Sequence, residues 1–531
     1  MLAGLLALPV ATVLASWLDW RPQSLDVLRH LASTVLLEYT HTSLRLCLMV
    51  AVGVALVGSA SAVTVTLFDF RGRKLFTWAL LLPLAVPSYV VAYAYTDFLQ
   101  YAGPFQTWLR QATGQQGRMF PEVRSLGGAA WVFVFTLYPY VYVLARTALA
   151  ERASHLMEAA RMLGAPLPRR IARVALPLAR PAIAAGVLLA LMETLADYGV
   201  GSYFGIQTLT TGIYKAWLAL DNRVAAAQLA SVLLVLVMLL LQLERRSQSR
   251  MRFAAGRNAA GSGARPLPLG PQGTALAWVV CGFPLLAGFV LPVVFMLRPL
   301  AADWGVLPWA SFVQWAFNSL RLAVGTAALA CAVALTLAFF QRQSAHWSVR
   351  AAVQLAGLGY AVPGAVIVVG LLLPVGWLQS AAPQSNVGYW MTATALGLVW
   401  AYLVRFCAVA LQSVQSGYTR VPASMDDAAR TLGVQGPALF ARVHWPLLRR
   451  SVAAAGLLVL VDVMKELPAT LVLRPFNSDT LAVVAYQLAR DERLGEAALP
   501  SLALVLAGLI PVLLLSRALD ARPEAHPEAP A

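Results

Sequence analysis

The stretch Glu158-Ala159-Ala160-Arg161-Met162-Leu163-Gly164 occurs a second time in this chain, as Asp427-Ala428-Ala429-Arg430-Thr431-Leu432-Gly433. Both copies continue to a proline, and the acidic residues and the prolines are each 269 positions apart (427 − 158 and 446 − 177). A repeat of about half the chain length is far too long for the unit of a solenoid. It predicts two similar halves fused in one polypeptide.

Two shorter matches extend the repeat toward the N-terminus. Ser43-Leu44-Arg45-Leu46 matches Ser319-Leu320-Arg321-Leu322, and Ala85-Val86-Pro87 matches Ala361-Val362-Pro363, both at a separation of 276. The change from 276 to 269 indicates a net seven extra residues in the first half, between Pro87 and the first long repeat. Because a proline inside an apolar run removes a backbone hydrogen bond and kinks a helix, we interpret the two Ala-Val-Pro prolines as packing kinks with no further role.

The composition predicts that the chain lies in a bilayer. Hydrophobic residues make up 59% of it, charged residues only 12%, and the mean hydropathy is +0.69, whereas roughly 25% charged residues are usual in soluble proteins. Apolar runs near the roughly 20 residues that cross a hydrocarbon core recur along the whole chain. We expect twelve spans, six in each half, at 2–18, 43–68, 75–99, 128–148, 177–196, 224–243, 273–297, 316–340, 351–376, 390–413, 448–471 and 499–516.

The expected fold class is therefore an all-α polytopic membrane protein with about twelve transmembrane helices in two homologous six-helix halves. The first half covers 1–243, a flexible cytoplasmic linker covers 244–272, the second half covers 273–518, and 519–531 form a disordered tail. A cleaved signal peptide and a retained first span are the alternatives for the apolar start of the chain. The absence of leading Lys or Arg favours the retained span.

Clusters of arginine predict the orientation. They lie around the first repeat, in the central linker and in the turn Arg71-Gly72-Arg73-Lys74, all on one side of a twelve-span chain. Short cytoplasmic loops are enriched in Lys and Arg, so this side is expected to be the cytoplasm, with both termini inside. The net charge of +16 is scattered over these loops. This argues against nucleic-acid binding and favours an acidic soluble partner or anionic lipid.

The long repeat predicts a helical hairpin between the fourth and fifth spans of each half. Ser154 and Ser424 are placed to cap a short helix, and Gly164 and Gly433 are placed to end it in the left-handed conformation. The residues 168–173 suggest a second short helix before Pro177 opens the next span. An ordered loop without a role is the alternative. We favour a docking surface, because a capped, alanine-rich helix is present in both halves.

The pattern Glu-Ala-Ala, three residues, Gly, nine residues, an aliphatic residue, one residue and Leu-Pro resembles the cytoplasmic loop motif of the membrane subunits of binding-protein-dependent ABC importers. The second copy departs from it at Asp427 and Trp445, which keeps the carboxylate. The resemblance implies a type I ABC importer permease fold in a bacterial inner membrane, a periplasmic binding protein, and two copies of an ATPase subunit that use ATP, with no cofactor bound by this chain. It implies ATPase coupling through Glu158, Ala159, Ala160, Gly164, Asp427, Ala428, Ala429 and Gly433.

A narrower resemblance lies downstream of each repeat. The stretches Glu193-Thr194-Leu195-Ala196-Asp197-Tyr198-Gly199 and Met464-Lys465-Glu466-Leu467-Pro468-Ala469-Thr470-Leu471 are similar to the iron(III) permease branch, in which both halves are fused. This similarity implies iron(III) as the cargo. Fused permeases for thiamine, polyamines and phosphonates are similar, so these cargoes remain alternatives.

The same stretches place acidic residues in predicted spans. Glu193 matches Asp462 and Asp197 matches Glu466, so each half carries two carboxylates four positions apart, on one face of a helix. A charge at the bilayer centre costs at least about 2.5–3.5 kcal/mol, so such residues usually face an aqueous path or a partner. Fe(III) is a hard cation suited to oxygen ligands. We therefore expect the four carboxylates and Tyr198 to line a translocation path where the halves meet.

Three other interpretations of these carboxylates remain open. They can mark the outer ends of helices, or Lys465 can pair with one of them for structure alone. They can also relay ions in a secondary transporter, although only an importer explains the paired hairpins.

The chain is not expected to be an enzyme or a motor. Its lysines are Lys74, Lys215 and Lys465, none of them preceded by glycine as a phosphate-binding loop requires, and no His-Glu-x-x-His or Gly-x-Ser-x-Gly motif is present.

Overall fold

The computed structural model describes residues 2–18, 26, 29–31, 33–255, 266–344 and 346–520; within these ranges the side chains of 151–155, 248–255, 306 and 515–520 are not described. Most described residues are helical, and the strands among them are β1 (Phe68–Asp69) and β2 (Leu267–Pro268), which pair in parallel. The predicted all-α fold class is confirmed. The predicted tail lies outside the described residues from 521 onward.

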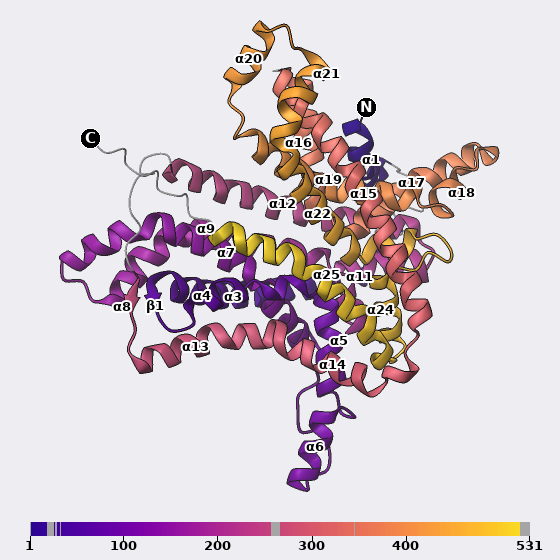
Figure 1. Cartoon of the computed structure of the whole chain (residues 1–531). Coiled ribbons are helices and arrows are strands. Elements are labelled where there is room, and N and C mark those ends of the chain that lie inside the picture. Colours follow the sequence, from indigo (N-terminus) through magenta and orange to yellow (C-terminus); the bar gives the residue numbers. More distant parts are fainter. Residues whose placement is uncertain are drawn as a thin grey trace.

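The helices of the two halves follow one another along the chain (Figure 1). Those of the first half are α1 (Leu2–Ala15), α3 (Leu36–Leu67), α4 (Arg73–Ala79), α5 (Ser88–Leu99), α6 (Pro104–Thr113), α7 (Leu126–Met162), α8 (Leu167–Arg170), α9 (Leu176–Ala196), α10 (Gly199–Tyr203), α11 (Leu209–Tyr214) and α12 (Arg223–Ala255). Those of the second half are α13 (Pro271–Leu285), α14 (Leu291–Ala302), α15 (Trp309–Gln343), α16 (Trp347–Leu358), α17 (Gly364–Ala381), α18 (Val387–Thr392), α19 (Leu396–Tyr418), α20 (Ala423–Thr431), α21 (Gly436–Leu439), α22 (Trp445–Lys465), α23 (Pro468–Leu473), α24 (Leu481–Arg490) and α25 (Leu494–Asp520).

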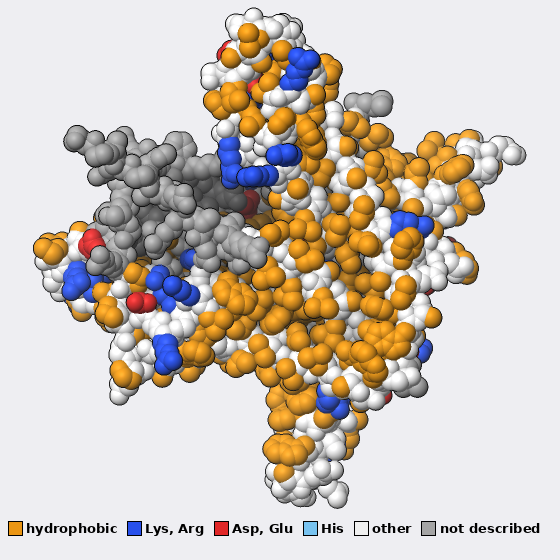
Figure 2. Space-filling view, in the orientation of Figure 1, with side chains coloured by type: hydrophobic (Ala, Val, Ile, Leu, Met, Phe, Trp, Pro, Cys, Tyr) orange, Lys and Arg blue, Asp and Glu red, His pale blue; other side chains and the backbone are white. Residues whose placement is uncertain are grey.

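Nine helices in the described part of the chain are long and apolar enough to cross a membrane, or ten if one bent pair counts as a single span. The apolar segment Leu2–Leu18 is shorter than these. Helix α22 carries Arg449, Arg450, Asp462 and Lys465, so its charges set it apart from the apolar spans. Figure 2 shows the broad hydrophobic surface that these helices present in the middle of the molecule.

Four of the expected spans are not single helices: 390–413 is divided between α18 and α19, 448–471 is divided between α22 and α23, and 75–99 and 351–376 are broken at their Ala-Val-Pro stretches. The segments Arg73–Ala85 and Ser88–Thr113 meet at 90°, and in the second half α16 gives way to a 3₁₀ turn (Gly359–Ala361) before α17. Val86 and Val362 are extended, with ψ of 121° in both, because a following proline disfavours the helical conformation. The prolines therefore break these spans, and the interpretation as packing kinks alone is wrong.

The halves interlock through these broken spans. Helices α1 and α12 of the first half pack against α17 of the second, while α14 and α25 of the second half pack against α5 and the neighbouring 3₁₀ turn (Leu82–Ala85) of the first. Each half therefore contributes its outer helices to the wall around the broken span of the other half. The two halves form one continuous hydrophobic core.

The Ser-Leu-Arg-Leu repeat has a structural cause. Ser43 Oγ accepts a hydrogen bond of 3.0 Å from the backbone N–H of Leu209, and Ser319 Oγ accepts one of 2.8 Å from that of Leu481. Leu209 and Leu481 are the first residues of α11 and α24. Since the first N–H groups of a helix have no partner within it, the repeated serine satisfies the same buried donor in both halves.

The hairpins differ from the prediction at their start and agree with it at their turn. Helix α7 continues without a break from the membrane span to Met162, so no separate helix begins at Ser154. Helix α20 is separate, but Pro422 occupies its N-cap and Ser424 lies inside it, so the predicted serine cap is wrong. The turns are as predicted, because Gly164 and Gly433 have φ of +76° and +77°.

The second short helix of each hairpin runs directly into the next span. Helix α8 continues through a π-helical turn (Ile171–Ala175) into α9, and α21 continues through a second π turn (Phe440–His444) into α22. Pro177 lies in the first turn of α9, as expected, but no break separates α9 from the short helix before it. A proline ring clashes with the carbonyl four residues earlier, and the wider π turn just before Pro177 and Pro446 relieves that clash.

The stretch predicted as a linker is partly helical. Helix α12 extends through Ala255, so 244–255 continue the sixth span, and α13 begins at Pro271. Residues 256–265 lie outside the described part of the chain.

Candidate functional site: a charged cavity between the halves

A cavity of about 190 Å³ lies where the two halves meet. The four carboxylates singled out in the sequence, Glu193, Asp197, Asp462 and Glu466, all line it. Further polar and charged side chains complete the wall, namely Ser88, Tyr89, Thr136, Tyr140, Tyr360, Arg405 and Lys465. Pro87 and Tyr360 come from the two spans broken at Ala-Val-Pro, so these breaks help to shape the cavity.

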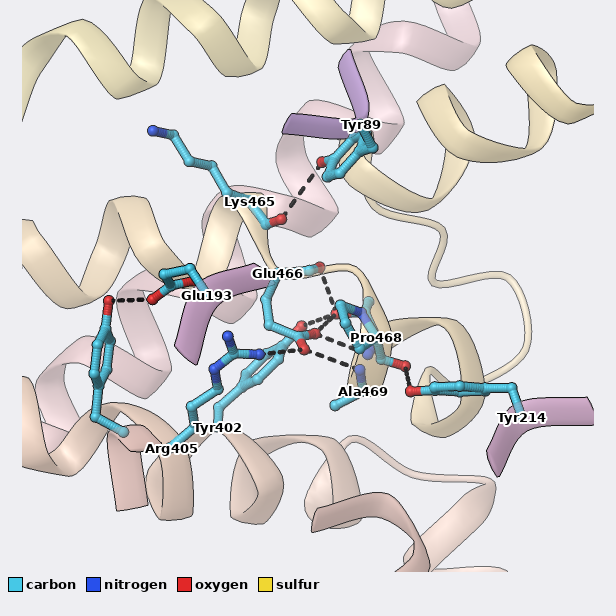
Figure 3. A network of polar contacts seen from close by, with 11 residues as sticks. Tyr89, Glu193, Tyr214, Tyr402, Arg405, Lys465, Glu466, Pro468 and Ala469 are labelled. Carbon is cyan, nitrogen blue, oxygen red and sulfur yellow. Dashed lines mark hydrogen bonds and ion pairs between the residues drawn. The ribbon is translucent and has the colours of Figure 1, made fainter. Parts of the chain in front are cut away.

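Glu193 links the halves. It lies one turn before the end of α9, and its Oε1 accepts a hydrogen bond of 2.9 Å from the hydroxyl of Tyr360, which lies in the 3₁₀ turn of the second half (Figure 3). Among the described residues no hydrogen bond to its other oxygen, Oε2, is found.

Asp197 and Glu466 share a structural role. Asp197 Oδ1 accepts a hydrogen bond of 2.8 Å from the N–H of Val200 at the start of α10. The Glu466 oxygens accept bonds from the N–H groups of Ala469 and Thr470 in α23, at 2.9 and 3.0 Å (Figure 3). Both residues lie at a helix end and cap the short helix that follows, which satisfies free N–H groups inside the membrane region.

Glu466 is also the acidic partner of Arg405. The Arg405 Nη1 atom lies 3.4 Å from Glu466 Oε1, and the two side chains are 13% and 1% exposed. Such a pair is buried, so the loss of either partner leaves an uncompensated charge.

The two remaining charged groups lie one turn apart on α22. Asp462 lines the cavity. Lys465 Nζ donates a hydrogen bond of 3.1 Å to the backbone carbonyl of Leu84 in the first half. The lysine therefore crosses to the other half.

Tyr198 is not part of the cavity wall. Its ring packs against those of Tyr214 and Tyr486, with centroids 4.2 and 5.9 Å away. Behind it, the Tyr214 hydroxyl donates a 2.7 Å hydrogen bond to the carbonyl of Pro468. In the part of the chain that is described, no three His, Cys, Asp or Glu side chains converge as a metal site.

Several wall residues were missed from the sequence. Arg405 is the one basic residue inside the predicted span 390–413, and an ionisable side chain within a span is a signal that could have identified it. Tyr89, Tyr140 and Tyr360 carry no such signal, because a tyrosine in an apolar run looks like an ordinary core residue.

The tips of the two hairpins form a second candidate surface. The first tip is the end of α7 with the turn at Gly164, and the second tip is α20 with the turn at Gly433. Glu158 and Asp427 are exposed, and so are Ala159 and Ala428, while Ala160 is half-buried and Ala429 is buried. Apolar side chains beside the turn glycines are strongly exposed, namely Met162 at 88%, Leu163 at 87% and Leu432 at 81%. Figure 2 shows Lys and Arg side chains near both tips, at the α20 end and at the α8 end.

Comparison with known proteins finds relatives that are permease proteins of transport systems. Residues 55–253 match the family model described as the inner membrane component of binding-protein-dependent transport systems. The chain is 24% identical over 493 residues, 90% of each chain, to the Fe(3+)-transport system permease protein FbpB 2 of Haemophilus influenzae.

Two further relatives are shorter. The sulfate transport system permease protein CysW of Escherichia coli is 30% identical over 218 residues, 40% of this chain and 72% of the relative. The putative 2-aminoethylphosphonate transport system permease protein PhnV of Salmonella typhimurium is 28% identical over 262 residues, 46% of this chain and 95% of the relative. With its duplicated hairpins and interlocked halves, the chain belongs to the family of inner membrane permease components of binding-protein-dependent ABC transport systems.

Proposed function

We propose that this chain is the permease of an importer that moves iron(III) from a periplasmic binding protein into the cytoplasm. Two ATPase subunits dock on the two hairpin tips, at Glu158 and Asp427 and the residues around them. Both termini lie on the same cytoplasmic side as the tips. The iron cargo is supported by the similarity to FbpB 2 along 90% of both chains.

The balance of charge in the cavity is the observation that supports a cationic cargo. Four carboxylates face two basic groups there. Arg405 is paired with Glu466 and Lys465 donates to a backbone carbonyl, so among the described residues no basic group makes an ion pair with Glu193 or Asp462. Lys465 still attracts Asp462 from one turn away on α22, but the four carboxylates outnumber the two basic groups, and this excess of negative charge favours a cation over a sulfate or phosphonate anion.

The interlocked halves suggest how ATPase docking at the tips changes the cavity. The outer ion pairs Arg298–Asp97 and Arg124–Glu492 join the halves at distances of 3.1 and 3.5 Å. Movement of the tips by the ATPases rocks the halves about the cavity and exposes it to each side in turn. An ion-coupled secondary transporter is the alternative, but it does not explain the two exposed hairpin tips.

Proteoliposomes that hold this chain with the ATPase and binding protein encoded beside it test the proposal. We expect binding-protein-stimulated ATP hydrolysis and iron(III) uptake, both lost in the Glu158→Ala, Asp427→Ala double variant. Sulfate, 2-aminoethylphosphonate, thiamine and a polyamine are offered in parallel, and preference for one of them would overturn the iron assignment. Uptake driven by an ion gradient without the ATPase would overturn the importer.

A further inference from the structure

A buried polar network lies directly beneath the exposed face of α20. Asp426, next to the exposed Asp427, is only 5% exposed, and His444 is fully buried. Arg342 Nε donates to Asp426 Oδ2 at 2.6 Å, and His444 Nε2 donates to Asp426 Oδ1 at 3.0 Å. One carboxylate on α20 is therefore held at both oxygens.

The network joins four elements that meet under the second tip. Arg342 comes from the end of α15, and its Nη2 also donates to the carbonyl of Pro422, the N-cap of α20, at 3.1 Å. His444 comes from the π turn, and its Nδ1 lies 3.2 Å from the hydroxyl of Tyr418, the last residue of α19. These bonds fix α20 against both neighbouring spans and the second arm of its own hairpin.

The first half has a different arrangement at the matching positions. At the separation of 269, Asp426 corresponds to Met157, Tyr418 to Leu149 and His444 to Ala175. These three side chains are 6%, 2% and 0% exposed and belong to the hydrophobic core. The first tip is therefore supported by apolar contacts, which have no preferred direction.

The backbone explains why the two tips need different support. Helix α7 runs unbroken for 37 residues from the membrane to Met162, so the first tip is the end of a long helix. The second tip is the separate nine-residue helix α20, joined to α19 by a short connection. A helix of this length is marginal on its own and depends on tertiary contacts.

We propose that Asp426, Arg342 and His444 are positioning residues that hold α20, the docking helix of the second tip, in place. In the first tip the unbroken helix α7 has this role. This inference rests on the proposed docking role of the tips for its functional consequence. The geometric part, that the network holds α20, can be tested without any ATPase.

Hydrogen–deuterium exchange on the purified full-length permease in lipid nanodiscs tests the geometric part. In Asp426→Asn we expect faster exchange over 423–432, because local protection reports local opening, with no change over 156–164. Met157→Ala is the matched variant in the first half, and we expect it to change exchange over 156–164 less than Asp426→Asn changes exchange over 423–432. Unchanged exchange over 423–432, or an equal rise in both segments, would overturn the proposal.

A second variant covers the case in which Asp426→Asn does not accumulate in the membrane. His444→Gln removes the imidazole while retaining a donor group, and the same contrast between the two segments is expected for it. The same two outcomes would count against the network.

Crosslinking to the ATPase tests the functional part separately. Leu163→Cys and Leu432→Cys occupy matching exposed positions, and the four native cysteines are buried. We expect Asp426→Asn to lower ATPase crosslinking at position 432 and to leave position 163 unchanged. Absence of crosslinking at both positions in the otherwise unaltered chain would overturn the docking role alone, and the exchange experiment would still decide whether the network holds α20.

Discussion

Tyr360 in the second half donates its hydroxyl to Glu193 in the first half, at 2.9 Å, in the wall of the central cavity. Hydrogen bonds to charged groups contribute about 1.5–3 kcal/mol. A bond that joins the halves in one conformation therefore biases the whole protein toward that conformation.

Tyr360→Phe removes this bond and keeps the ring. We expect a shift of roughly tenfold or more away from the present conformation, since the lost bond is worth about 1.5 kcal/mol or more. The shift should raise ATP hydrolysis in the absence of binding protein. Tyr389→Phe is the control, because Tyr389 is 62% exposed and does not line the cavity. Equal basal hydrolysis in both variants would show that this bond does not set the equilibrium.

Glu193→Gln and Asp462→Asn test the charge of the cavity. Each removes one of the four cavity carboxylates, so each is expected to lower iron(III) uptake, and the double variant is expected to lower it most. Uptake per ATP hydrolysed is the measurement. Glu122→Gln serves as the control, because the Glu122 side chain is 57% exposed and pairs only with Arg118 among the described residues. Unchanged uptake in the double variant would count against a cationic cargo.

Glu466→Ala tests the buried ion pair. It leaves Arg405 without its acidic partner and also removes the cap of α23. Breaking a buried pair typically costs about 3–5 kcal/mol, so a clear drop in the Tm of the purified protein is expected. Combining Glu466→Ala with Arg405→Met should recover part of the lost Tm, because the uncompensated charge is then gone. A double variant as unstable as Glu466→Ala would assign the effect to the cap.

The turn glycines provide a conformational test. Gly164 and Gly433 have positive φ and open space around them, so alanine there meets only the backbone penalty of about 1 kcal/mol. We expect Gly433→Ala and Gly164→Ala to weaken ATPase-dependent uptake. Gly325→Ala is the matched control, since Gly325 lies inside α15 with the same open space and without a positive φ. A similar loss in all three variants would point to a general effect on folding.

The pH dependence of the second tip follows from Asp426. Burial raises the pKa of its carboxyl, but the hydrogen bonds and charges of Arg342 and His444 outweigh burial and hold the pKa below its ordinary value. Such a group stabilises the fold above its unfolded pKa of about 3.9 and loses that contribution as the pH falls through the lower folded value.

Exchange protection over 423–432 is therefore expected to stay level from neutral pH down to about pH 5 and to fall only below about pH 4. The charged and titratable groups that face Asp426 are Arg342 from α15, Tyr418 from α19 and His444 from the π turn. Exchange rates corrected for intrinsic pH dependence give the measurement. Loss of protection already near neutral pH would show that another group controls the tip.

The sequence by itself was sufficient for the duplicated membrane fold, the left-handed glycine turns at Gly164 and Gly433, and the selection of Glu193, Asp197, Asp462 and Glu466. These features follow from local pattern and from the high cost of charges in hydrocarbon, both of which can be evaluated along a single chain. Only the tertiary structure decided that Tyr360 reaches Glu193, that Tyr198 lies behind the cavity wall, and that Arg342 and His444 hold Asp426. The partners in these contacts are separated by as many as 167 residues, and the way the halves interlock determines which side chains meet.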